Sequence, residues 1–169
     1  MSSVLMVIAP HEFRDEEYTE PKTVFESRGA RVTTASLDPG QCRGRFGTVA
    51  HADIALADAD PGDYDFVVFV GGGGSKVYFD DPDAHRLAVG ARDLSRFVGA
   101  ICIAPSILAH AGLLSGRRAT AFESQEDDLV ERGAIWTGQA VTVDPPFVTA
   151  NGPEAARAFG EAIADLAGL

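Results

Sequence analysis

Three short apolar runs without a polar interruption are the feature that most constrains how this chain can fold. They occupy residues 4–9, 66–70 and 97–101. A strand with one face in solvent alternates apolar and polar residues, whereas a continuous apolar run is typical of a strand covered on both faces. The chain is therefore expected to build a central sheet with other layers packed on each side.

Helix-like and strand-like segments alternate along the rest of the chain. Helices are expected at residues 15–28, 82–96, 103–112, 124–133 and 153–166. Further strands are expected at residues 31–35, 119–122, 135–136, 141–143 and 147–149, with a small hairpin at 42–50. This alternation predicts an α/β, flavodoxin-like three-layer sandwich, in which a mostly parallel sheet carries helices on both faces. Ligands of such sheets bind beyond the carboxyl ends of the strands.

Individual residues mark the ends of these helices. Asp81 precedes a proline and is the expected N-cap of the second helix. Ser124-x-x-Asp127 resembles a capping box, with aspartate in place of the usual Glu or Gln. Pro21 lies inside the first helical segment, where we expect it to bend or break the helix.

Length and charge exclude several classes of protein. The 169 residues suit one domain, residues 1–169, and are enough for a substantial core. The net charge is −11 and no basic cluster is present, so nucleic acid is a poor partner. No apolar stretch reaches about 18 residues, so we expect no membrane span. The first residues lack a charged segment, so we expect no signal peptide.

The chain has two cysteines, Cys42 and Cys102. They are too few for a disulfide scaffold, and no C-x-x-C motif or Cys/His cluster indicates zinc. We therefore expect no metal, no cofactor and a reducing, cytoplasmic environment. Cys42 lies in a polar loop that can expose it, and it has no evident partner.

Cys102 stands between an apolar strand and a helix-like segment. Ala100 and Ala104 flank it at two residues on either side, and a nucleophile on a tight strand-to-helix turn needs such small neighbours. The free N–H groups of the following helix would favour the thiolate, so we expect a lowered pKa for Cys102. The alternative is an inert core cysteine, and the spacing alone leaves both interpretations open.

Four glycines, residues 71–74, follow the 66–70 strand. They complete neither G-x-G-x-x-G nor the Walker pattern, because the position that the first motif requires is Lys76. A nucleotide is therefore not expected. The N–H groups of such a loop can form an oxyanion hole that faces a nucleophile, and a plain turn is the alternative.

Four acidic residues, Glu12, Asp15, Glu16 and Glu17, surround the start of the first helix. Most should be surface carboxylates that interact favourably with the helix dipole. One of them could instead point inward and share a proton with Cys102, because two acids held close together cannot both ionise easily.

Four histidines have unequal prospects. His11 follows the first strand at the expected active edge and is a candidate to line the site. His85 and His110 fall in expected helices, where packing or surface roles are the simpler interpretation. His51 lies in an irregular stretch and is uninformative.

Four motifs then follow one another in order along the chain. They are Phe13-Arg14-Asp15-Glu16-Glu17 before Pro21, Val70-Gly71-Gly72-Gly73, Gly99-Ala100-Ile101-Cys102-Ile103-Ala104-Pro105, and Asn151-Gly152-Pro153. In this order they resemble the ThiJ/PfpI superfamily, also called the DJ-one superfamily, of glutamine-amidotransferase-like fold. The resemblance covers nearly the whole chain and implies a homodimer. It also implies that Cys102 is the nucleophile and Glu17 the buried glutamate, with Gly72, Gly73 and Ile103 as oxyanion donors.

The departures from this family bear on function. Peptidase-type members have a histidine directly after the cysteine, where this chain has Ile103. The glutamate that their neighbouring subunit contributes matches Val77 here. Deglycase-type members have a histidine where this chain has Phe122, and the common proline of the glycine loop is Gly71.

Two functions remain open at this point. One is glyoxalase-like or deglycase-like chemistry on a small reactive carbonyl, such as a 2-oxoaldehyde. In it Cys102 adds to the carbonyl and Glu17, protonated when the thiolate forms, moves protons. The alternative is a non-catalytic redox-sensing or stress-protection protein whose Cys102 oxidises reversibly. Peptide hydrolysis is less expected because Ile103 offers no base.

Overall fold

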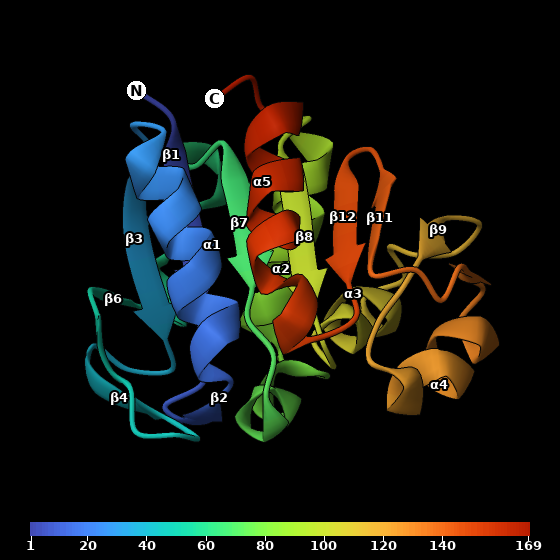
Figure 1. Cartoon of the computed structure of the whole chain (residues 1–169), viewed down its shortest axis with the longest axis horizontal. Helices are drawn as coiled ribbons and strands as arrows, with labels where there is room; N and C mark the ends of the chain where they lie inside the picture. Colours follow the sequence, from blue (N-terminus) through green and yellow to red (C-terminus); the bar gives the residue numbers. More distant parts are fainter.

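A computed structural model describes residues 1–169 and contains a seven-stranded central sheet (Figure 1). The strand order is β11-β12-β8-β7-β1-β3-β6, and only the β11–β12 pair is antiparallel. The strands are β1 (Ser3–Val7), β3 (Arg31–Ser36), β6 (Ile54–Ala55), β7 (Phe66–Phe69), β8 (Phe97–Ile101), β11 (Val141–Asp144) and β12 (Phe147–Ala150). The helices are α1 (Asp15–Ser27), α2 (Pro82–Asp93), α3 (Pro105–His110), α4 (Glu126–Glu131) and α5 (Ala156–Leu166). The predicted α/β fold is confirmed.

Smaller elements surround this core. A three-stranded sheet joins β2 (His11–Phe13), β4 (Gly40–Gly44) and β5 (Val49–Ala52), and a two-stranded sheet pairs β9 (Arg118–Ala119) with β10 (Ile135–Trp136). Short 3-10 turns are η1 (Leu56–Asp58), η2 (Pro61–Asp63), η3 (Gly73–Tyr78), η4 (Glu123–Gln125) and η5 (Pro153–Ala155). No helix combines the length and the apolar character needed to cross a membrane.

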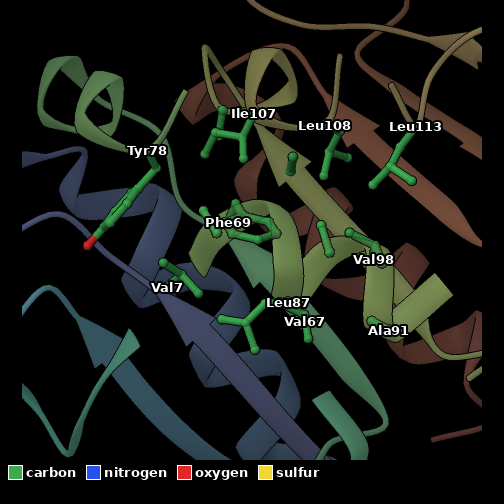
Figure 2. Packing of buried hydrophobic residues seen from close by; sticks show 14 of the residues in the cluster. Val7, Val67, Phe69, Tyr78, Leu87, Ala91, Val98, Ile107, Leu108 and Leu113 are labelled. Atoms are coloured by element: carbon green, nitrogen blue, oxygen red, sulfur yellow. The ribbon is translucent and has the colours of Figure 1, made fainter. Parts of the chain in front are cut away.

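The central strands are buried on both faces, as their unbroken apolar runs predict. In β1, Leu5 and Val7 belong to the core under α2 and α3, whereas Val4 and Met6 belong to the core under α1 and α5. Figure 2 shows the first of these cores. Each side chain buried in this way contributes about 1.5–3 kcal/mol to stability, so the two cores hold the layers together.

The carboxyl ends of β7, β8 and β12 lie at the end of the sheet opposite both chain termini (Figure 1). The glycine loop and the strand-to-helix turn therefore meet at one edge. The helices α1 and α5 lie side by side in front of the sheet in this view, and α2 lies behind it. The first helix begins at the same edge, which brings its acidic first turn to the site.

Pro21 does not break α1, which continues to Ser27, so the expected break is excluded and a bend stays a prediction. Pro21 is buried against α5, where a Cβ on Gly160 would lie 2.8 Å from the Pro21 Cα, so close helix packing stabilises the continuous helix. The Ser124 capping box does not form either. The Ser124 hydroxyl donates to Gln125 Oε1 at 3.0 Å, and α4 begins only after a 3-10 turn.

Other local predictions are confirmed. Asp81 caps α2 by accepting a hydrogen bond from the Ala84 N–H at 2.8 Å. The expected hairpin is the antiparallel β4–β5 pair. Asp15 at the start of α1 accepts N–H bonds from Phe46 at 2.9 Å and Thr48 at 2.8 Å, which fixes the hairpin turn against the first helix.

Candidate active site

Cys102 occupies a strained backbone conformation directly after β8. Its φ is +64°, in the left-handed region that residues other than glycine rarely adopt. Two backbone hydrogen bonds hold it there, from its own N–H to the Ala150 oxygen at 2.9 Å and from the Phe122 N–H to its oxygen at 2.8 Å. Strain of this kind persists where the surroundings enforce it, often at functional sites. The predicted tight strand-to-helix turn is present at Cys102, and the role of the cysteine as a nucleophile stays a prediction.

The Glu17 side chain lies behind Cys102 and has no contact with solvent. Its relative exposure is 0%, and neither carboxyl oxygen makes a hydrogen bond of ordinary length and angle. A Cβ on Gly71 would lie 2.6 Å from Glu17 Oε1 and 2.6 Å from the Cys102 Cβ, so all three residues converge at one point. Gly71 is needed there because this structure leaves no room for a side chain.

The two acidic groups of this pair have strongly shifted pKa values. Burial raises the pKa of Glu17 to about 8, although the nearby Cys102 thiol and the Arg14 charge lower it. Burial, followed by the charge of Glu17, raises the pKa of Cys102 to about 12. Between these two values the pair therefore holds one proton.

These shifts contradict the expected behaviour of Cys102. The N–H groups of Gly72 and Ile103 do lower the pKa of its thiol, but burial and the carboxylate outweigh them. The prediction of a lowered pKa is therefore wrong. Which of the two groups ionises first stays a prediction.

The glycine loop is pressed against β2. Gly72 has a φ of +95°, and a Cβ there would lie 2.6 Å from the Glu12 oxygen. The Ser75 N–H and hydroxyl both donate to the Gly72 oxygen, at 3.0 Å and 2.8 Å, and hold the loop in this shape. The N–H groups of Gly72 and Ile103 act on the Cys102 sulfur from this position. For Gly73 the structure shows no contact with the sulfur, so its role stays a prediction.

The structure separates the four acidic candidates. Glu12 is exposed, Glu16 pairs with the Arg14 Nε at 2.6 Å, and Asp15 is bonded to the hairpin turn. Only Glu17 reaches Cys102, as the family resemblance implies.

The histidines and the second cysteine lie elsewhere. The exposed His11 is on β2 and its ring makes no hydrogen bond, so its place in the site stays a prediction. His110 is packed, as expected, with ring nitrogens 2.7 Å from Asp80 and 2.9 Å from Asp128. Cys42 is not exposed: it is a β4 residue with 2% exposure, and its thiol donates a hydrogen bond to the Gly40 oxygen at 3.8 Å.

Sequence reasoning missed Arg14, the residue immediately before α1. Its backbone N–H donates to the Gly71 oxygen at 3.0 Å, which joins the helix start to the glycine loop. Its guanidinium lies 4.8 Å from the centre of the Phe46 ring, and its charge lowers the pKa of Glu17. The sequence does contain a signal for this role of Arg14, since it is a single basic residue directly before the acidic first turn of α1.

Sequence reasoning also missed a groove of about 540 Å³ beside the elbow. Its walls are Ala121, Phe122, Glu123, Glu126, Trp136, Gly138, Asn151, Gly152, Pro153 and Glu154. The Phe122 N–H that bonds to Cys102 belongs to one wall, and the Ala150 oxygen that accepts the Cys102 N–H directly precedes the other. Phe122 and the residue before Asn151 thus connect the groove walls to the backbone of Cys102, which does not itself line the groove.

Known proteins resemble this chain along nearly its full length. An uncharacterised protein of Methanocaldococcus jannaschii is 41% identical over 94% of this chain and 79% of its own. A protein of Pyrococcus abyssi named as a deglycase is 28% identical over 88% of this chain and 90% of its own. The crystal structure of a ThiJ/PfpI domain protein from Brachyspira murdochii superposes with a TM-score of 0.95 and 31% identity, covering 97% of this chain and 95% of that one. The DJ-1/PfpI family matches residues 2–166, and the chain therefore belongs to this family.

Proposed function

We propose that this protein converts small 2-oxoaldehydes, free or as adducts with amines, into 2-hydroxy acids through a covalent bond to Cys102. One observation carries the proposal: a fully buried carboxyl group, whose pKa burial raises to about 8, lies against the Cys102 thiol. A base with a pKa near the working pH is best suited to accept a proton during reaction.

The first step adds the thiol to the aldehyde. The Glu17 carboxylate accepts the Cys102 proton while the sulfur bonds to the aldehyde carbon, so no free thiolate is required. The carbonyl oxygen becomes an oxyanion, to which we assign the N–H groups of Gly72 and Ile103 as donors, and Glu17 returns its proton to this oxygen to give a hemithioacetal and a free carboxylate. The raised pKa of Cys102 suits this route, because the thiol remains protonated until a substrate arrives.

The remaining steps move one hydrogen and add one water. Glu17 removes the proton from the carbon bonded to sulfur, and a proton returns to the neighbouring carbon, which yields a thioester of the 2-hydroxy acid. Water then cleaves the thioester and restores the Cys102 thiol. The sum is one 2-oxoaldehyde plus one water giving one 2-hydroxy acid, so no oxidant or cofactor is consumed.

In an amine adduct the Cys102 sulfur displaces the amine at the same carbon, the amine leaves with the proton that Glu17 accepted from the thiol, and the same hemithioacetal results. The relative that bears the name deglycase supports this extension. Family membership also supports a homodimer and a cytoplasmic protein, which sedimentation of the purified chain and fractionation of cells would test.

Two alternatives are less well supported. A redox sensor would use the same Cys102 sulfur, and the intact mass of the chain after mild peroxide treatment would test that alternative. Peptide cleavage needs a proton for the leaving amine, and Ile103 cannot supply one.

The test is to follow lactate formed from methylglyoxal by the purified protein, with unfolded casein as a parallel substrate. We expect lactate from the wild-type chain, none from Cys102→Ser, and no casein cleavage by either. If casein cleavage survives further purification and disappears in Cys102→Ser, the proposal is wrong and His11 becomes the candidate base. If Cys102→Ser forms lactate as fast as the wild-type chain, the cysteine has no covalent role.

A further inference from the structure

The backbone of Arg14 is bonded to both sides of the Glu17–Cys102 pair. Its N–H donates to the Gly71 oxygen at 3.0 Å, and its own oxygen accepts the Glu17 N–H at 3.1 Å. Gly71 lies where Glu17 and Cys102 converge, so close that a Cβ on it would meet both side chains. The start of the Arg14 side chain is therefore fixed beside the acid pair.

Two neighbours hold the Arg14 guanidinium in one place. Its Nε donates to Glu16 Oε2 at 2.6 Å, and its central carbon lies 4.8 Å from the centre of the Phe46 ring. An aromatic face attracts a guanidinium at this distance. Phe46 is 64% exposed in the turn between β4 and β5, and its N–H donates to Asp15 at 2.9 Å. The Phe46 ring thus covers a guanidinium instead of entering the core.

The fixed guanidinium is a positive charge beside a buried acid. Burial raises the pKa of Glu17, the Cys102 thiol and the Arg14 charge lower it, and the Glu16 charge raises it further. The pKa of Arg14 is itself raised, first by its hydrogen bond to Glu16 and also by the charges of Glu17 and Cys102. Arg14 and Glu16 therefore act on the same pair with opposite signs.

The other charged side chains around the pair are exposed or already bonded. Asp15 is bonded to the hairpin turn, and Arg157 of α5 pairs with Glu161 at 3.0 Å. The strands β7 and β8 contribute no charged residue. The remaining charged or titratable groups of α1, β2 and the hairpin at this edge are exposed: His11, Glu12, Glu20, Arg43 and Arg45.

We propose that Arg14 is a positioning residue for the Glu17–Cys102 pair, held by the Phe46 ring so that its positive charge stabilises the pair once one proton has left. This inference rests on the proposed function for the reaction that the pair performs. Arg14 acts through Glu17 and Cys102 and does not need to touch the substrate. The hairpin thereby influences the reactivity of Cys102, although it belongs to a separate sheet.

The first ionisation of the pair can be followed without substrate, by NMR of the Glu17 carboxyl carbon and the Cys102 Cβ carbon. Its midpoint should rise by about half a pH unit in Arg14→Gln, the size expected for one partly exposed charge, and should fall in Glu16→Gln. Arg14→Lys keeps the charge and should stay close to the wild-type midpoint. Phe46→Leu keeps the charge but removes the ring face, so we expect a smaller rise.

Arg28→Gln is the matched control. Arg28 directly follows the other end of α1, its side chain is 31% exposed against 30% for Arg14, and it also pairs with an acid, Asp165. We expect no shift of the midpoint in this variant. Shifts of the same sign in Arg14→Gln and Glu16→Gln would show a structural disturbance and overturn the proposal. An Arg14→Gln midpoint equal to that of Arg28→Gln would overturn it as well.

Turnover separates this inference from the proposed function. With methylglyoxal as substrate, the rise of kcat/KM with pH should move to higher pH in Arg14→Gln and to lower pH in Glu16→Gln. Shifted NMR midpoints without lactate formation by any chain would contradict the proposed function and leave the role of Arg14 standing. Lactate formation with NMR midpoints that do not move would do the reverse.

Discussion

The two sides of Cys102 use the same residue type in opposite ways. Behind the sulfur, Glu17 is sealed from water and has no ordinary hydrogen bond, and burial raises its pKa to about 8. On the groove side, Glu123, Glu126 and Glu154 face solvent. Burial makes one glutamate a proton acceptor suited to neutral pH, whereas the other three lie at the surface. The environment, more than the residue type, therefore decides which glutamate takes part in the proposed chemistry.

Loss of the sulfur should have the largest effect. Cys102→Ser should lower carbonyl turnover at least about 1000-fold, because removal of a covalent nucleophile commonly costs this much or more. Cys42→Ser is the control, since the Cys42 side chain is buried on β4 away from the site. The measurement is kcat/KM for methylglyoxal. Comparable losses in both variants would mean that Cys102 has no special role in turnover.

Loss of the buried carboxyl should come next. In the wild-type chain kcat/KM should rise with pH and level off above about 8, because Glu17 accepts a proton only when it is ionised. Glu17→Gln should lower kcat/KM about 100-fold and remove this rise. The pH profile is the critical readout, since a variant that is merely less active but keeps the rise would assign the base to another residue.

Stability should depend on pH through the same group. Between pH 4.5, the ordinary value for glutamate, and about 8, folded Glu17 keeps a proton that the unfolded chain has lost. The contribution of Glu17 to the stability of the folded state is therefore largest below pH 4.5, and it is lost as the pH rises toward 8. Over this pH range the unfolding free energy of the wild-type chain should fall by about 3 kcal/mol relative to that of Glu17→Gln.

Urea unfolding at several pH values measures this difference. Glu20→Gln is the matched control, because Glu20 is an exposed acid on the same helix. If the wild-type and Glu17→Gln chains show parallel pH dependence, Glu17 titrates as an ordinary surface carboxylate.

The glycine loop should show the smallest effect on the free energy of unfolding. Gly72→Ala places a Cβ 2.6 Å from the Glu12 oxygen at a φ of +95°, so the loop must move away from β2. We expect a loss of about 2 kcal/mol of unfolding free energy, together with a lower kcat as the N–H donor shifts. Gly73→Ala is the control, since a Cβ there meets no atom within 4 Å. Equal stability of the two variants would show that Gly72 is not held tightly.

Local sequence patterns predicted much of the fold and the strand-to-helix turn at Cys102. The apolar runs located β1, β7 and β8, and small residues around Cys102 indicated the elbow. Failures arose where distant segments decide the outcome. Pro21 remains helical because Gly160 of another helix packs on it, and no local pattern around Pro21 contains that contact.

The groove lined by Phe122 and Trp136 could not be predicted from the sequence. Phe122, Trp136 and Glu154 come from three separate segments, and only the folded chain brings them to one groove. The pKa of Cys102 was predicted in the wrong direction for a similar reason. The helix start is visible in the sequence, whereas the burial of Glu17 behind the sulfur depends on the packing of α1 against the sheet.

Glu17 and Cys102 form one coupled acid pair, and burial raises the pKa values of both groups. The direct measurement is a pH titration of the Cys102 Cβ carbon by NMR in the wild-type chain and in Glu17→Leu, with the Cys42 signal as internal reference. We expect the thiol pKa to lie well above its usual range in the wild-type chain. It should fall by about one unit or more in Glu17→Leu, because the neighbouring negative charge is removed. A Cys102 pKa that is the same in both chains, or that lies below its usual range in the wild-type chain, would contradict the account.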